Sequence, residues 1–184
     1  ARFVMLKLSP MLDWHKAIAD LKGTVDEVHI VSVGGECKEL LLVLAGKVSV
    51  SSVDSGSLEN GVRVYCVDIM PKAEADGEYK RSEFCYTIGG AADNPPTLNP
   101  QPSTLNSQLS TLNSQFLLEP NASIMKAGCF AELSQAYGVE AIGPNSHLFV
   151  SSGRVEQFPG RKFAIEAVCT LNKRQLKQTL GTLK

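Results

Sequence analysis

A charge-free, repetitive segment divides the chain, and a single compact domain is not expected to run through it. Residues 95–115 contain no acidic or basic side chain, and the heptad 97–103 (TLNPQPS) is followed by near-copies that begin at Thr104 and Thr111. A segment this polar buries too little apolar surface to offset the entropy lost on ordering it. The sequence therefore predicts two folded units, residues 1–93 and 116–184, joined by a linker at residues 94–115.

The two units differ in charge. Residues 1–93 carry 10 basic and 14 acidic side chains, a net charge of −4, and residues 116–184 carry 8 basic and 5 acidic, a net charge of +3. The whole chain has a net charge of −1, which argues against a generically basic, nucleic-acid-coating protein but leaves room for a local basic patch. No charged-then-apolar signal pattern opens the sequence and no apolar run reaches about 18 residues, so we expect a cytoplasmic protein without a membrane span.

The cysteines and histidines do not form a recognisable metal or disulfide pattern. The five cysteines are odd in number, widely spaced and without a C-x-x-C pair, which favours free thiols in a reducing compartment. The three histidines share no metal-like spacing, so we expect no metal site. No G-x-S-x-G motif is present and no cysteine has an evident activating partner, so catalytic residues stay unassigned.

The first unit alternates between strand and helix patterns. Short apolar runs predict strands at residues 3–8, 25–33 and 62–69. A helix is predicted at residues 11–21, and the i, i+3, i+4, i+7 spacing of apolar residues predicts another at residues 36–45. This alternation indicates βαβ units in an α/β fold with a mostly parallel sheet. Three strands form only half of a doubly wound sheet, so the unit resembles the back half of a larger domain.

The second unit has the element order of a small α+β sandwich. We expect a strand at residues 116–118, a helix from residue 121 to about residue 137 that ends at Gly138, and strands at residues 147–150 and 163–168. Asn172 is then predicted to cap a basic helix at residues 173–183. A β-α-β-β-α order with short connections predicts a ferredoxin-like fold.

Two loops that follow predicted strands supply candidate pocket residues. Ligands of open α/β sheets bind beyond the carboxyl ends of the strands, where helix N-termini and loops converge. Six residues at these positions are candidates to line a substrate or cofactor pocket, namely Ser9, Pro10, Asp13, Gly35, Glu36 and Lys38. Purely structural roles are equally open, with Ser9 and Asp13 serving helix entry, the glycine pair a tight turn and Glu36 the helix dipole.

Basic side chains cluster in the second unit. They are Arg161, Lys162, Lys173, Arg174 and Lys177. Lys173 and Lys177 lie one turn apart on the predicted helix, where they can contact the phosphates of a nucleic acid. A solvated basic face that only keeps the domain soluble is the alternative.

Several stretches, in order along the chain, resemble one family. In the first unit they are KLSPMLD (7–13), VHIVSV (28–33) and ECKELL (36–41), and in the second EPNASIMKAG (119–128), NSHLF (145–149) and FPGR (158–161). With these stretches the chain resembles the bacterial class I SAM-dependent methyltransferases that carry a THUMP-like C-terminal domain. The resemblance implies the C-terminal half of a Rossmann-like methyltransferase sheet followed by a ferredoxin-like α+β domain.

The resemblance also implies what this chain lacks. The family's SAM-binding glycine loop and its Asp-Pro-containing catalytic stretch would lie upstream of Lys7, and its THUMP-like domain would follow the helix at residues 173–183. The implied cofactor of the full-length enzyme is S-adenosyl-L-methionine, the implied partner is structured RNA, and the fragment alone is expected to be inactive. A non-catalytic binding or scaffold module, and a methyltransferase with a small-molecule or protein substrate, remain the alternatives.

Overall fold

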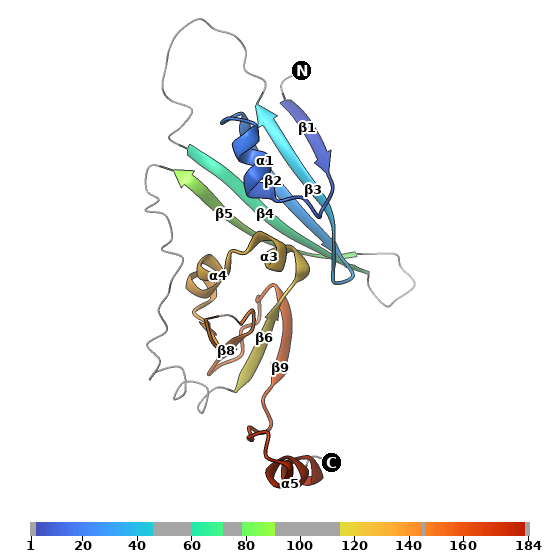
Figure 1. Cartoon of the computed structure of the whole chain (residues 1–184), viewed down its shortest axis with the longest axis vertical. Helices are drawn as coiled ribbons and strands as arrows, with labels where there is room; N and C mark the ends of the chain where they lie inside the picture. The colour runs from blue at the N-terminus through green and yellow to red at the C-terminus, as the bar shows by residue number, and fades with distance from the viewer. Residues whose placement is uncertain (1–2, 46–59, 72–78, 91–114, 145, 183–184) are drawn as a thin grey trace, which may run out of the picture.

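The computed structural model describes residues 3–45, 60–71, 79–90, 115–144 and 146–182, and these residues form two β-sheets and several helices (Figure 1). All of the expected linker except Gln115 lies outside the described residues. Within the described residues, no helix is long and apolar enough to cross a membrane. All five cysteines are free thiols.

The first sheet is mixed rather than mostly parallel. Its five strands are β1 (Phe3–Leu8), β2 (Val25–Val33), β3 (Glu36–Ala45), β4 (Asn60–Pro71) and β5 (Tyr79–Gly90), in the order β1-β3-β2-β4-β5. Only β2 and β4 pair in parallel, and the other three pairs are antiparallel. The expectation of a mostly parallel sheet is therefore wrong. Because β1, β2 and β4 nevertheless run in the same direction, their carboxyl ends lie at the same end of the sheet.

The segment 36–45, predicted as a helix, is the strand β3. Gly34 and Gly35 have φ angles of +60° and +87°, and Val33 pairs with Glu36 across them, so they form a two-residue hairpin turn. The helical spacing was misleading because residues 40–44 are all apolar and satisfy a strand as well as a helix. Leu40 and Leu42 are both fully buried, as expected for alternate residues on one face of a strand.

The helix predicted at residues 11–21 is present in shorter form as α1 (Trp14–Asp20). Its only fully enclosed side chain is that of Trp14, which belongs to the buried core with Val28 and Ile30 of the sheet. The strand β5 was not predicted. The alternation of Phe84, Tyr86 and Ile88, which are buried or half-buried, with exposed Cys85 and Thr87 is the signal for it.

The second sheet is antiparallel, with the order β7-β8-β6-β9. Its strands are β6 (Phe116–Pro120), β7 (Glu140–Ala141), β8 (Phe149–Ser151) and β9 (Gly160–Ala164). Where one helix was predicted there are two, α3 (Ala122–Ala127) and α4 (Phe130–Tyr137), because Gly128 adopts a left-handed φ of 72° that ends α3. Gly138 ends α4 as predicted, also in the left-handed region.

The final helix, α5 (Lys173–Thr182), lies beyond the end of β9 and away from both sheets (Figure 1). Its predicted cap is confirmed, since the Arg174 N–H donates to Asn172 Oδ1 at 2.9 Å.

The two sheets share one hydrophobic core. Its fully buried members include Ile30 and Leu40 from the first sheet and Leu118, Ile124 and Leu133 from the second unit. The helix α3 makes the connection, because it follows β6 directly and packs against β2, β3 and β4. The ends of β2 and β4 are thereby held next to the junction between β6 and α3 (Figure 1).

Candidate functional site

The predicted pocket residues that follow β1 are engaged in local structure. Ser9 Oγ accepts a hydrogen bond from the Met11 N–H at 3.3 Å, and Pro10 lies in the same turn. Asp13 caps α1, where its Oδ1 accepts from the N–H groups of Lys16 (3.3 Å) and His15 (2.9 Å). These backbone hydrogen bonds lower the pKa of the Asp13 carboxyl. Ser9 and Asp13 therefore serve helix entry.

The predicted pocket residues that follow β2 lie partly inside and partly outside a cleft. Gly35 lies in the hairpin turn and also lines a cleft described below. Glu36 and Lys38 form an exposed ion pair with each other, and the Lys38 ammonium lowers the pKa of Glu36. Of the six predicted pocket residues, only Gly35 lines the cleft.

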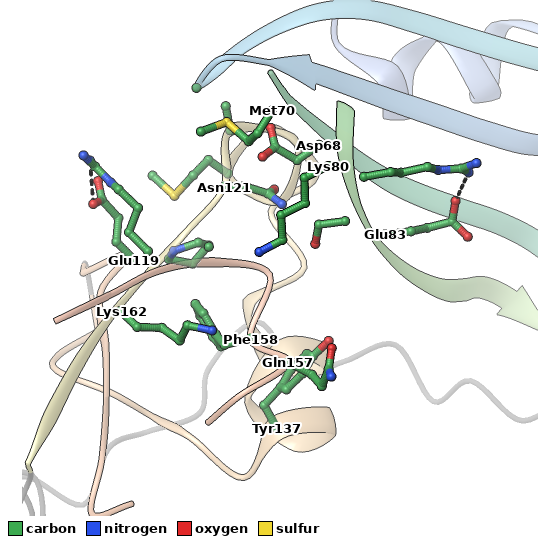
Figure 2. A pocket seen from close by; sticks show the side chains of 18 of the residues that line it. Asp68, Met70, Lys80, Glu83, Glu119, Asn121, Tyr137, Gln157, Phe158 and Lys162 are labelled. Atoms are coloured by element: carbon green, nitrogen blue, oxygen red, sulfur yellow. Dashed lines mark hydrogen bonds and ion pairs between the residues drawn. The ribbon is translucent and has the colours of Figure 1, made fainter. Parts of the chain in front are cut away.

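The cleft lies where the first sheet meets the second unit (Figure 2). It has a volume of about 950 Å³. Its walls come from the carboxyl ends of β2 and β4, the start of β5, the junction between β6 and α3, and the segment that leads into β9. Polar ends of several strands and one helix meet there, which is the usual position of a binding site in an α/β sheet.

A nearly buried carboxylate forms one wall of the cleft. Asp68, on β4, is only 7% exposed, and its Oδ1 accepts a hydrogen bond of 2.5 Å from the fully buried Ser32 hydroxyl on β2. Within the described residues, Asp68 Oδ2 has no hydrogen-bond donor. Burying a carboxylate is costly unless its oxygens are hydrogen-bonded, so this second oxygen is suited to accept from a ligand.

An unsatisfied amide lies beside this carboxylate in the same cleft (Figure 2). Asn121 Oδ1 accepts from the Ser123 hydroxyl at 2.7 Å and from the Ile124 N–H at 3.1 Å, which orients the amide group. Asn121 Nδ2 is buried, and it is the single buried side-chain nitrogen or oxygen in the described part of the chain that lacks a hydrogen-bond partner. A buried donor without a partner costs free energy, which a bound acceptor would recover.

Two lysines reach into the cleft from opposite sides (Figure 2). Lys80 comes from β5, and Lys162 comes from β9, where its Nζ donates to the Glu156 carbonyl oxygen at 2.6 Å. Arg161 also lines the cleft and is paired with Glu119 at 2.6 Å, which raises the pKa of the Arg161 guanidinium.

The basic residues predicted as one cluster therefore occupy two places. Arg161 and Lys162 line the cleft, whereas Lys173, Arg174 and Lys177 lie on α5, beyond the far end of β9 (Figure 1). Sequence reasoning missed Asp68, Lys80 and Asn121. A lone acidic residue inside the apolar strand pattern of β4 was the available signal for Asp68, and no comparable signal marks the other two.

The protein is an α/β protein in which a mixed β-sheet is joined to a small antiparallel α+β unit. The family described as a ferredoxin-like domain matches residues 116–159, so the predicted ferredoxin-like domain is present in the second unit. No curated protein matches the sequence.

The fold of the chain as a whole is similar to that of a solved structure. A "putative methyltransferase" from Porphyromonas gingivalis W83 matches over 97% of this chain, with a TM-score of 0.65 and 23% sequence identity. The match covers 38% of the length of that bacterial protein. The likeness therefore extends over nearly the whole chain, and the chain spans well under half of the length of that larger protein.

Proposed function

We propose that this chain is part of a SAM-dependent methyltransferase, comprising the C-terminal strands of the Rossmann-like sheet and the ferredoxin-like domain that follows them. The observation that carries the proposal is the fold likeness to a methyltransferase across 97% of the chain. The family match at residues 116–159 independently supports the ferredoxin-like part of the proposal.

The first sheet ends in an edge that supports this proposal. β1 is an edge strand of this sheet, and its side chains Phe3, Val4 and Met5 are 62%, 49% and 53% exposed. Successive side chains of a strand point to opposite faces, so both faces of β1 present apolar surface to solvent. An apolar edge strand with unpaired backbone groups is a surface that proteins normally cover. In the proposed enzyme, the upstream strands of the methyltransferase sheet pair with β1.

The proposal places the main cofactor site outside the described residues. Five of the six predicted pocket residues lie outside the cleft, and Ser9, Asp13, Glu36 and Lys38 are engaged by local hydrogen bonds or an ion pair. The resemblance implies that the SAM-binding glycine loop lies upstream of Lys7, so no chemical step is assigned to the described residues. We expect calorimetry to detect SAM binding by the complete protein, and no micromolar affinity in the 184-residue chain.

RNA is the proposed substrate class. Arg161 and Lys162 line the cleft, and Lys173, Arg174 and Lys177 are exposed on α5. Such side chains bind phosphates without regard to sequence, and their binding weakens as salt rises because counterions are released.

The test uses the complete protein and the triple variant Lys173→Glu, Arg174→Glu, Lys177→Glu. RNA affinity should fall and its salt dependence should flatten, with SAM affinity unchanged. Lys22→Glu, an exposed charge reversal near the end of α1, is the control and should bind RNA like the parent. Transfer of labelled methyl groups from SAM to RNA is the activity readout. Transfer only to protein or small molecules would reject the RNA assignment, and no transfer to any substrate would reject the enzyme.

A further inference from the structure

The cleft contains charges that the described residues leave without a neutralising partner. Arg81 pairs with Glu83 and Arg161 with Glu119. The Glu156 carboxylate pairs with Arg154, outside the cleft. The charged groups that remain without an ion-pair partner in the described part of the chain are the Asp68 carboxylate, which is hydrogen-bonded only to the Ser32 hydroxyl, and the ammonium groups of Lys80 and Lys162. Among the residues that the structure describes, Lys162 bonds a neutral carbonyl oxygen and Lys80 makes no ion pair.

These groups define the chemistry of a ligand. Two ammonium groups that approach from opposite sides suit one anionic group between them. Asp68 Oδ2 requires an N–H or O–H donor, and Asn121 Nδ2 requires an acceptor. A matching ligand therefore has an anionic group and, apart from it, a donor next to an acceptor. A cleft of about 950 Å³ is also within the size range of small-molecule sites.

A nucleotide meets all of these requirements. Its phosphate supplies the anion, and the Watson–Crick edge of every base places an N–H donor beside a nitrogen or oxygen acceptor. An unpaired nucleotide in a single strand presents both its base edge and its phosphate, whereas a paired one does not.

We propose that this cleft binds one unpaired nucleotide, with its phosphate between Lys80 and Lys162 and its base edge on Asp68 and Asn121. The inference rests on the proposed function for its RNA source, since the same unit can come from a single-stranded RNA or from a free nucleoside monophosphate. Ser32 is a positioning residue, because its hydrogen bond holds the Asp68 carboxylate toward the cleft.

The first arm of the experiment measures which part of the ligand each residue recognises. The complete protein is titrated calorimetrically with the four nucleoside 5′-monophosphates and with the corresponding nucleosides. Asp68→Asn should weaken both kinds of ligand about tenfold, because it replaces an accepting carboxylate with an amide. Lys80→Gln should weaken only the monophosphates, because the nucleosides have no phosphate. Lys38→Gln replaces an exposed lysine of the first sheet that lies outside the cleft, so it should change the affinity for neither the monophosphates nor the nucleosides.

The second arm identifies the source of the nucleotide. Fluorescence anisotropy compares a single-stranded oligoribonucleotide with its duplex. Tight binding of the single strand that is weakened by Lys80→Gln assigns the cleft to RNA, whereas binding of the monophosphates with no gain for the strand assigns it to a free nucleotide. Thermal unfolding checks each variant, and Lys80→Gln, at an exposed side chain, carries the test if Asp68→Asn does not fold.

Two results would overturn the inference, namely no binding of any nucleotide or strand, and equal affinities in the parent and in Lys80→Gln. Methyl transfer separates this failure from failure of the proposed function. A protein that binds nucleotides but transfers no methyl group retains the cleft assignment and loses the enzyme assignment. A protein that methylates RNA with unchanged KM after Lys80→Gln retains the enzyme and loses the cleft.

Discussion

The sulfur atoms of Cys66 and Cys129 lie 4.0 Å apart in the interior of the protein, in a contact between the two units. Cys66 belongs to β4 and is fully buried, and Cys129 directly precedes α4 and is 3% exposed. The separation is about twice the 2.03–2.05 Å length of a disulfide, so the residues are a pair of thiols in contact. Their hydrogen bond and their burial raise the pKa of the Cys66 thiol, which therefore stays protonated.

The first prediction concerns thiol reactivity. A short pulse of iodoacetamide on the native protein should modify Cys85 and Cys169, which are exposed, and should reach Cys37 more slowly. Cys66 and Cys129 should react only after denaturant is added, because alkylation requires an accessible thiolate. Mass spectrometry of the digested protein distinguishes the five sites. Modification of Cys66 or Cys129 in the native state would contradict the shared core.

The second prediction concerns alkaline pH. An unfolded cysteine loses its proton near pH 9.0, whereas the raised pKa of Cys66 keeps it protonated in the folded state. The folded state then binds one more proton than the unfolded state, so the free energy of unfolding falls as pH rises above about 9. Cys66 contributes up to about 1.4 kcal/mol per pH unit to this fall. Burial raises the pKa of Tyr86 as well, which adds a similar fall above pH 10.0.

Urea unfolding between about pH 8 and pH 10.5 measures this slope. Cys66→Ala should make it shallower by the contribution of one group. Cys169→Ala, at an exposed thiol, is the matched control and should keep the slope of the parent. Identical slopes for all three proteins would mean that the Cys66 thiol ionises as readily in the folded protein as in the unfolded chain.

Much of the secondary structure could be predicted from local patterns. The strand β2 has the predicted bounds, and the left-handed glycine after α4 and the Asn172 cap of α5 lie where their residue types indicate. The error at β3 arose because residues 40–44 are uniformly apolar and fit either period. The two-residue glycine turn before it, which favours a hairpin, was the better guide.

The candidate site was less predictable because it depends on contacts between the two units. Asp68 lies on β4 and Asn121 precedes α3, and no local pattern indicates that they line one cleft. They come together because α3 packs on the first sheet, a long-range contact that follows from burial of its apolar side chains. Arg161 and Lys162 were chosen for their charge alone, and their place in the cleft follows from the pairing of β9 with β6.

The third prediction concerns the close approach of β6 and β9. Gly160 pairs with Pro120, and a Cβ atom at Gly160 would come within 2.0 Å of the Glu119 carbonyl oxygen. Because the obstructing atoms are backbone, Gly160→Ala must displace a strand, and it should cost about 1–3 kcal/mol or more. Gly153→Ala is the matched control, since nothing lies within 4 Å of the position of its Cβ. Urea unfolding should separate the two variants, and equal stabilities would contradict the contact.

The last prediction concerns the packing of the two units as one cooperative structure. Ile124 lies on α3 in the second unit and is fully buried in the core that α3 shares with the first sheet. Ile124→Ala removes apolar contacts from this shared core and should destabilise the protein by about 2–5 kcal/mol. The neighbouring Met125→Ala, at a side chain that is 39% exposed, is the control and should have a much smaller effect.

Trp14 makes this test selective for the shared core, because it is the single tryptophan of the chain and lies in the first unit. If the core is shared, Ile124→Ala shifts the unfolding transition seen by Trp14 fluorescence as far as the transition seen by hydrogen exchange in β6 and β8. Two units that fold independently would give a different result, with the Trp14 transition unmoved and only the second unit weakened. A shared transition would also mean that the cleft, whose walls come from both units, forms only when the whole structure folds.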